Sequence, residues 1–107
     1  MHARASMSPR ANAGTFHGAG GGRSLLFNGH VDVIPEGSLE NWEYGPWSGE
    51  IVQGRMYGRG TSDMKSGVAA FTMVMKAIRE SGVLPKGDVV AEYVMDEELT
   101  GNGTLAC

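Results

Sequence analysis

Three short segments with acidic residues, one of which also holds a histidine, are the parts of this chain that could do chemistry. They are Gly29-His30-Val31-Asp32-Val33, Gly58-Arg59-Gly60-Thr61-Ser62-Asp63-Met64-Lys65 and Asp96-Glu97-Glu98. Imidazole nitrogen and carboxylate oxygen bind Zn²⁺ at about 2.0–2.2 Å, and a catalytic zinc site keeps one position open for water. The only cysteine is Cys107, so a closed structural site built from several thiolates is excluded. These residue types therefore indicate a catalytic metal centre.

His30 and Asp32 are two residues apart in a segment expected to be extended, so their side chains point to the same side. A metal-bound imidazole needs an acceptor for its other ring nitrogen. Asp32 is placed to supply one and would fix the tautomer. The alternative is a surface histidine beside an aspartate in a turn, because a lone His-x-Asp pair is common.

Asp63 directly precedes a long helical pattern, which leaves two interpretations open. It is either a metal ligand or the N-cap of that helix, a role that aspartate fills well. Lys65 lies near the same helix start, where a positive charge opposes the helix dipole. We therefore expect Lys65 to have another task, such as balancing nearby acids.

Asp96, Glu97 and Glu98 are consecutive acids at the end of an apolar run and repel one another. They either form a solvated turn or surround a cation. Because neighbouring side chains diverge, one carboxylate could bind a metal while the next reaches the metal-bound water. The metal would lower the pKa of that water, and the second carboxylate would take its proton as a general base.

The pattern of apolar and turn residues predicts an α/β fold with the chemical groups at strand ends, where open α/β sheets bind ligands. Residues 1–9 show no periodicity and are expected to be disordered. Residues 34–49 form a long loop that its aromatic residues Trp42, Tyr44 and Trp47 are expected to pin to the surface. The regular elements are expected as strands over 12–16, 24–28 and 88–95, a hairpin over 50–57 turned at Gly54, a helix over 65–80 and the start of another over 102–107.

The composition of the 107 residues suits a globular chain, with 41% apolar and 20% charged residues. A net charge of -3 argues against a nucleic-acid partner. No apolar run approaches the roughly 20 residues that span a bilayer. A single cysteine does not require an oxidising compartment, so a cytoplasmic location is expected. Arg4 and Arg10 would also suit a transit peptide, but that stretch is short and lacks an amphipathic face.

The three motifs together resemble the M20 family of metallopeptidases and deacylases. This family includes acetylornithine deacetylase, succinyl-diaminopimelate desuccinylase, aminoacylase and carboxypeptidase G. The likeness covers roughly residues 10–107 and lies in residues 29–35, the loop around Trp47, and residues 56–67 and 96–103. The last motif looks closest to the acetylornithine deacetylase and formyl-aminopyrimidine deformylase-like branch.

The resemblance implies a site with two divalent metal ions, Zn²⁺ or Co²⁺. His30 would bind one ion, Glu98 the other, and Asp63 would bridge both and be followed by a cis peptide bond. Glu97 would act as the general base and Asp32 would orient His30. The implied reaction is hydrolysis of an amide bond in an N-acyl amino acid or small peptide.

The resemblance also implies a partial three-layer zinc-peptidase-like catalytic domain, with residues 10–107 as its N-terminal part. Family members continue with a further acidic ligand, a lid or dimerisation domain and a late histidine ligand, and the full-length proteins are expected to be homodimers. His2 and His17 lie in the wrong part of the chain to replace that histidine, so this chain is expected to be inactive alone. Two alternatives remain: a truncated, non-catalytic α/β binding module, and a small α/β protein whose acids only decorate turns.

Overall fold

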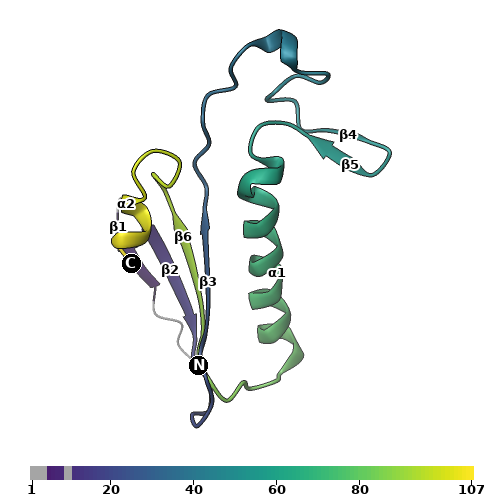
Figure 1. Ribbon diagram of the computed structural model, residues 1–107. Helices are drawn as coiled ribbons and strands as arrows, with labels where there is room; N and C mark the ends of the chain where they lie inside the picture. The colour runs from purple at the N-terminus through teal and green to yellow at the C-terminus, as the bar shows by residue number, and fades with distance from the viewer. Residues whose placement is uncertain (1–4, 9–10) are drawn as a thin grey trace.

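A computed structural model describes residues 5–8 and 11–107 and contains a four-stranded sheet with a long helix on one face (Figure 1). The strand order is β1-β2-β6-β3. Strand β2 runs antiparallel to both neighbours, whereas β3 and β6 run parallel. The strands of this sheet are β1 (Ala5–Ser8), β2 (Ala11–Phe16), β3 (Leu25–His30) and β6 (Val89–Val94). The expected α/β class is confirmed.

Strand β1 lies in the segment that the sequence predicted to be disordered. Residues 5–8 pair with β2 from Ala5↔Gly14 to Ser8↔Ala11. Backbone hydrogen bonds to β2 hold this edge strand in place. Its formation therefore does not require the alternating apolar pattern by which a strand is predicted from sequence. Residues 1–4 and 9 of that predicted segment lie outside the described residues.

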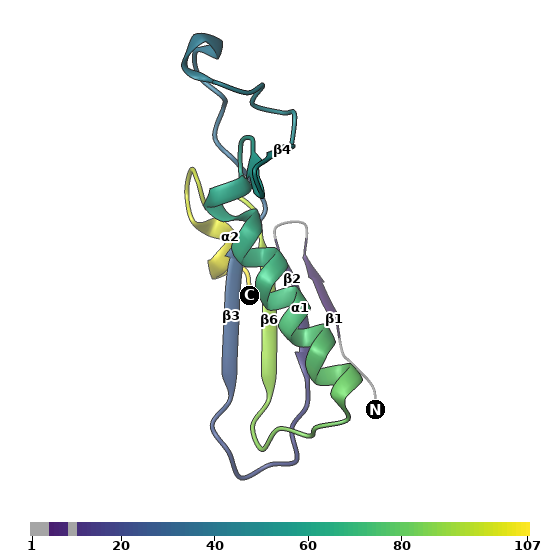
Figure 2. The ribbon, with the colours of Figure 1, turned by 90° about the vertical axis from the view of Figure 1, so that its right-hand side faces the viewer.

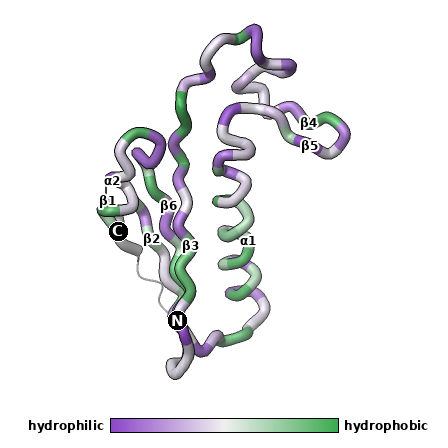
Figure 3. Tube along the Cα trace, viewed as in Figure 1, coloured by the Kyte–Doolittle hydropathy of each residue, from purple (hydrophilic) through white to green (hydrophobic). Residues whose placement is uncertain are grey.

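Helix α1 (Ser66–Ser81) crosses one face of the sheet (Figure 2). Its buried Phe71 stacks on Phe27 of β3 with ring centroids 5.7 Å apart and meets Tyr93 of β6 at 5.2 Å. Figure 3 shows that helix α1 is most hydrophobic in its middle turns. The described residues bury few apolar side chains, and besides Phe71 these are Ala11, Val89, Ala91 and Val94.

Gly29 permits the close approach of α1 to β3. A Cβ atom added there would lie 2.8 Å from Cε1 of Phe71 and 3.1 Å from Cγ2 of Val68. Only a residue without a side chain fits this contact. The start of α1 is therefore held beside the end of β3, next to His30.

The long loop after β3 leads into a hairpin of β4 (Glu50–Val52) and β5 (Arg55–Tyr57). The indole of Trp42 donates to the carbonyl of Glu36 at 2.9 Å. The ring of Tyr44 packs on Tyr57 at 4.4 Å. The contact of Tyr44 with Tyr57 holds the loop against the hairpin, whereas the hydrogen bond of Trp42 lies within the loop, and Trp47 is 61% exposed.

The molecule is elongated, with extents of 53 × 34 × 20 Å. Its accessible surface is 7479 Å², compared with about 5,700 Å² for a compact monomer of this mass. The short helix α2 (Asn102–Leu105) lies on the opposite face of the sheet from α1 (Figures 1 and 2). Within the described residues, no helix is both long and apolar enough to cross a membrane.

Candidate metal centre

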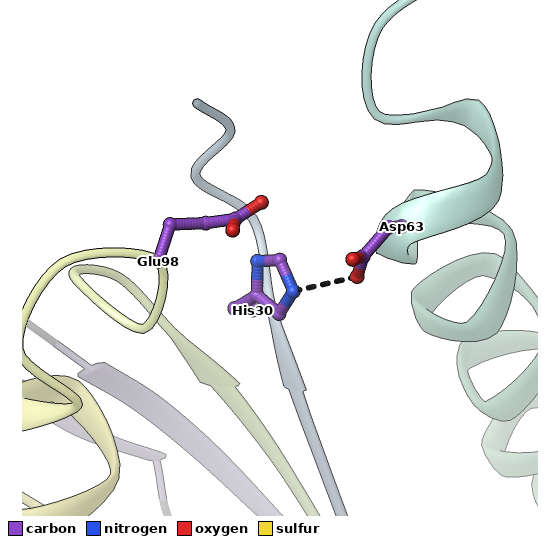
Figure 4. A group of neighbouring side chains, drawn as sticks. All are labelled: His30, Asp63 and Glu98. Carbon is purple, nitrogen blue, oxygen red and sulfur yellow. Dashed lines mark hydrogen bonds and ion pairs between the residues drawn. The ribbon is translucent and has the colours of Figure 1, made fainter. Parts of the chain in front are cut away.

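The three predicted metal ligands come together at one edge of the sheet. His30 is the last residue of β3, and Glu98 follows β6 by four positions. Because β3 and β6 are parallel, their carboxyl ends meet at the same edge. Asp63 arrives from the turn that precedes α1 (Figure 4). One ligand atom from each of these residues lies within 4.8 Å of the other two.

His30 is the buried centre of this group, with a side chain only 5% exposed. Its Nε2 lies 3.1 Å from Oδ1 of Asp63 and 3.7 Å from Oε2 of Glu97. Its Nδ1 lies 3.1 Å from the carbonyl oxygen of Asp32. All of these neighbours are acceptors, so each ring nitrogen can donate a hydrogen bond when it carries a proton. Burial alone would lower the pKa of His30, but the hydrogen bond to Asp63 and the other nearby acceptors and charges raise it.

Asp32 lies behind His30, on the side away from Asp63. Its Oδ2 accepts the backbone N–H of Glu98 at 3.2 Å. Its Oδ1 is buried 3.5 Å from Nδ1 of His30 and has no hydrogen-bond partner. Burial would raise the pKa of Asp32, but hydrogen bonds from backbone N–H groups, that of Glu98 foremost, lower it. Asp32 therefore stays ionised beside the imidazole.

Asp63 lies in an irregular turn over Thr61–Lys65, where the residue and its successor leave helical geometry. The Asp63-Met64 peptide bond is cis, as the family resemblance implied. Helix α1 has no side-chain cap hydrogen bond, so Asp63 does not act as its N-cap. The carboxylate is instead 77% exposed and meets His30.

The acidic turn after β6 separates the three consecutive acids. Asp96 adopts a left-handed conformation with φ of 68°. Its carboxylate accepts the hydroxyl of Thr100 at 2.7 Å, and its carbonyl accepts the N–H of Gly101 at 2.8 Å. Asp96 is therefore tied into the turn, while Glu97 and Glu98 approach His30.

The donor set fits a divalent cation of the zinc type. One imidazole nitrogen and two carboxylate oxygens converge, and these are hard-to-borderline ligands that suit Zn²⁺ and related metals. The 3.1 Å between Nε2 of His30 and Oδ1 of Asp63 is near the roughly 3.4 Å that separates two ligands of a tetrahedral zinc ion. A metal would replace the Nε2 proton, and Asp32 would keep the Nδ1 proton in place.

A small cavity of about 230 Å³ adjoins the ligand cluster. Asp32, Asp96 and Glu98 lie on its polar side, and the rest of its wall is largely apolar, formed by Val33, Ile34, Pro35 and Leu99. No pattern in the sequence identified this cavity, because its walls come from the loop after β3 and from the acidic turn. It places space for a small molecule directly beside the carboxylates.

Comparison with known proteins gives consistent matches. The profile of the peptidase family M20/M25/M40 matches residues 26–107. Succinyl-diaminopimelate desuccinylase from Wigglesworthia glossinidia brevipalpis is 43% identical over 86 residues, which cover 79% of this chain and 23% of that protein. The N-formyl-4-amino-5-aminomethyl-2-methylpyrimidine deformylase of Bacillus subtilis is 40% identical over 84 residues, or 78% of this chain and 20% of that protein.

Among solved structures, the M20 family metallo-carboxypeptidase Sso-CP2 from Sulfolobus solfataricus matches with a TM-score of 0.78 and 25% identity. The match covers 91% of this chain and 23% of the carboxypeptidase. This chain thus spans between a fifth and a quarter of the length of these relatives. The profile match covers well over half of the chain and includes all three acidic segments. The chain belongs to peptidase family M20/M25/M40.

Proposed function

We propose that the protein of which these residues form the site hydrolyses a linear amide bond with the help of two divalent metal ions, Zn²⁺ or Co²⁺. The observation that carries this proposal is the convergence of His30, Asp63 and Glu98 to within 4.8 Å. In the proposal His30 and Glu98 each bind one ion and Asp63 bridges them. When bound, such ions polarise the amide carbonyl and lower the pKa of water.

Glu97 is the proposed general base. Its carboxylate is about half exposed and its Oε2 lies 3.7 Å from Nε2 of His30, at the rim of the ligand cluster. From there it can take a proton from the attacking water and pass it to the leaving amine nitrogen. Asp32 does not touch the reacting atoms in this scheme. It holds the Nδ1 proton of His30 and, through the N–H of Glu98, the backbone of the acidic turn.

The substrate is proposed to be an N-acyl amino acid or a small peptide. The cavity beside Glu98 is small and mostly apolar-walled, which suits a short acyl group or side chain. The names of two relatives refer to the removal of a succinyl and a formyl group, and a third refers to carboxypeptidase activity. Removal of a small acyl group from an amine is therefore the reaction to test first.

The described residues bring together only three candidate ligand side chains. Two zinc ions that share one bridging carboxylate need more protein ligands than this. We therefore assign the hydrolytic activity to the whole protein, in which further ligands complete the site. For the 107-residue chain alone we expect metal binding but no turnover. This expectation separates the proposal from a binding module that has lost the metal.

The first test is titration of the chain with Zn²⁺ and Co²⁺ in competition with a chromophoric chelator. His30→Ala, Asp63→Ala and Glu98→Ala should each weaken binding sharply. Glu80→Gln is the control, because Glu80 pairs with Lys76 on the exposed side of α1 at 2.8 Å. Equal binding by all four variants and the unmodified chain would refute the metal site. Hydrolysis of N-succinyl, N-formyl and N-acetyl amino acids by the whole protein then tests the reaction.

A further inference from the structure

Lys65 makes a contact that the proposed chemistry does not use. Its sequence position, at the start of a helix and two residues after Asp63, predicted that it would balance nearby acids. In the structure its Nζ instead donates to the backbone carbonyl of Val31. Val31 lies between His30 and Asp32, in the segment that supplies the imidazole and its acceptor.

The same lysine also closes the turn that carries Asp63. Its backbone N–H donates to the carbonyl of Gly60 at 2.9 Å. Its side chain then runs across Gly60, where an added Cβ would lie 3.3 Å from Cδ and 3.5 Å from Nζ of Lys65. The same Cβ would lie 2.7 Å from Cγ1 of Val33. The turn and the chain after β3 therefore touch at Gly60, and Lys65 spans the contact.

Val31 is fixed from two directions as a result. Its N–H donates to the carbonyl of Val94 in β6 at 2.9 Å, and its carbonyl accepts from Lys65. One peptide segment is thus tied both to the strand that leads into Glu97 and Glu98 and to the turn that carries Asp63. A charged donor makes such a tie stronger than a neutral one.

We propose that Lys65 is a positioning residue that sets the separation of His30 and Asp63 by tying the Asp63 turn to the carbonyl of Val31. This inference rests on the proposed metal site, because that separation matters for function only if the two side chains share an ion. It assigns Lys65 no contact with the metal or the substrate. The ammonium group acts through the two backbone segments that it joins, the Asp63 turn and the segment around Val31.

The test compares Lys65→Met, which keeps the aliphatic stem, with Lys65→Arg, which keeps a charged donor. Lys76→Met is the matched control, because Lys76 lies in helix α1, which follows Lys65, and pairs with Glu80 rather than with the site. We expect Lys65→Met to weaken Co²⁺ binding about tenfold, the range found for groups that orient metal ligands. It should also alter the visible absorption bands of bound Co²⁺. Lys65→Arg should restore most of both, and Lys76→Met should match the unmodified chain.

A second readout needs no metal. The ring ¹⁵N signals of His30 report its hydrogen bond to Asp63, so Lys65→Met should move them toward their positions in Asp63→Ala. Unchanged signals and unchanged Co²⁺ affinity in Lys65→Met would overturn the role of Lys65. If the unmodified chain binds no Co²⁺, the proposed function fails, and the His30 signals of the metal-free chain still decide the role of Lys65.

A third readout uses the unmodified chain alone and so does not depend on whether a variant folds. The ammonium protons of Lys65 should exchange with solvent more slowly than those of Lys76 and Lys86. They should also show magnetisation transfer to protons around Val31. Exchange as fast as that of the other two lysines would overturn the proposal.

Discussion

Asp32 joins His30 to the acidic turn: its carbonyl oxygen lies 3.1 Å from Nδ1 of His30, and its carboxylate accepts the N–H of Glu98 at 3.2 Å. One residue thus holds both the imidazole and the backbone of a second proposed ligand. Two segments that are 66 residues apart in sequence depend on it. Substitutions at Asp32 should consequently reveal how the site is held together.

Asp32→Asn should lower metal affinity about tenfold, and Asp32→Ala about a hundredfold, the two ends of the range for groups behind a metal-bound histidine. Asparagine keeps an oxygen for the N–H of Glu98 but loses the charge beside the imidazole, whereas alanine loses both. Zn²⁺ competition titrations measure the difference. Asp88→Asn is a suitable control because Asp88 lies near His17, away from the site. Unchanged affinity in Asp32→Ala would contradict the prediction.

Substitutions of Glu97 and Glu98 should have different effects on metal binding and on turnover, although the two residues are neighbours in the sequence. Glu98→Gln should weaken metal binding strongly, because it replaces a charged carboxylate with a neutral amide, a much weaker ligand for a divalent cation. Glu97→Gln should leave metal affinity near that of the unmodified chain. In the whole protein, Glu97→Gln should lower kcat by about 10²–10⁴-fold through loss of proton transfer. If Glu97→Gln instead abolishes metal binding and Glu98→Gln does not, the two proposed roles are wrong.

Gly29→Ala should destabilise the fold by about 1–3 kcal/mol, as overpacking of a core contact does. The new methyl group would lie 2.8 Å from the Phe71 ring and push α1 away from β3. Thermal unfolding followed by circular dichroism measures the loss.

Gly14→Ala supplies the matched control for that substitution. Gly14 also lies in a strand, but an added Cβ there meets nothing within 4 Å. This variant should gain about 0.4–1 kcal/mol, because alanine restricts the unfolded chain. Equal destabilisation by both substitutions would show that loss of a strand glycine, rather than contact with Phe71, is responsible.

Asp88 should make stability depend on pH in the acid range. It accepts the N–H of Gly18 at 2.9 Å and lies 3.5 Å from His17. The backbone hydrogen bond, assisted by His17, lowers its pKa below the usual 3.8. A lowered folded-state pKa stabilises the protein above the unfolded pKa, and that contribution is lost as pH falls through the folded value.

Urea unfolding midpoints measured between about pH 6 and pH 2 test this linkage. The unmodified chain should lose more stability over the acid part of that range than Asp88→Asn, which cannot ionise. Parallel curves for the two proteins would show that Asp88 makes no such contribution. Lys76→Met leaves the surroundings of Asp88 unchanged, so its unfolding midpoint should depend on pH as that of the unmodified chain does.

Local patterns in the sequence predicted most of the elements. The helix expected over 65–80 is α1 (Ser66–Ser81), and it ends at Gly82, which adopts the left-handed conformation with φ of 71°. The hairpin turned at Gly54 and the strand expected over 88–95 are also present. These elements have strong apolar periodicity or glycine turns, and such signals are local. The strand before His30 extends two residues further than expected because its pairing with β6 continues to His30↔Val94.

Contacts between residues far apart in the chain could not be predicted from local sequence patterns. Nothing in residues 5–8 indicates an edge strand, since that strand depends on a partner in β2. The choice between ligand and helix cap for Asp63 depended on where the turn places its side chain, which the residues around it do not reveal. The tie from Lys65 to Val31 spans 34 positions and joins a side chain to a backbone carbonyl, a pairing without a residue-type signature.

The position of β6 has a consequence for how this part of the protein is made. β6 lies between β2 and β3 although it follows both in the chain, and its pairing Leu25↔Val89 joins residues far apart. On the ribosome, β2 and β3 emerge early with no strand to bridge them, and they stay unjoined until residues 89–94 have left the exit tunnel. Glu97 and Glu98 emerge directly afterwards. The four-stranded sheet and the edge that carries the proposed metal ligands should therefore assemble together once residues 89–98 have emerged, because β6 both completes the sheet and leads into the acidic turn.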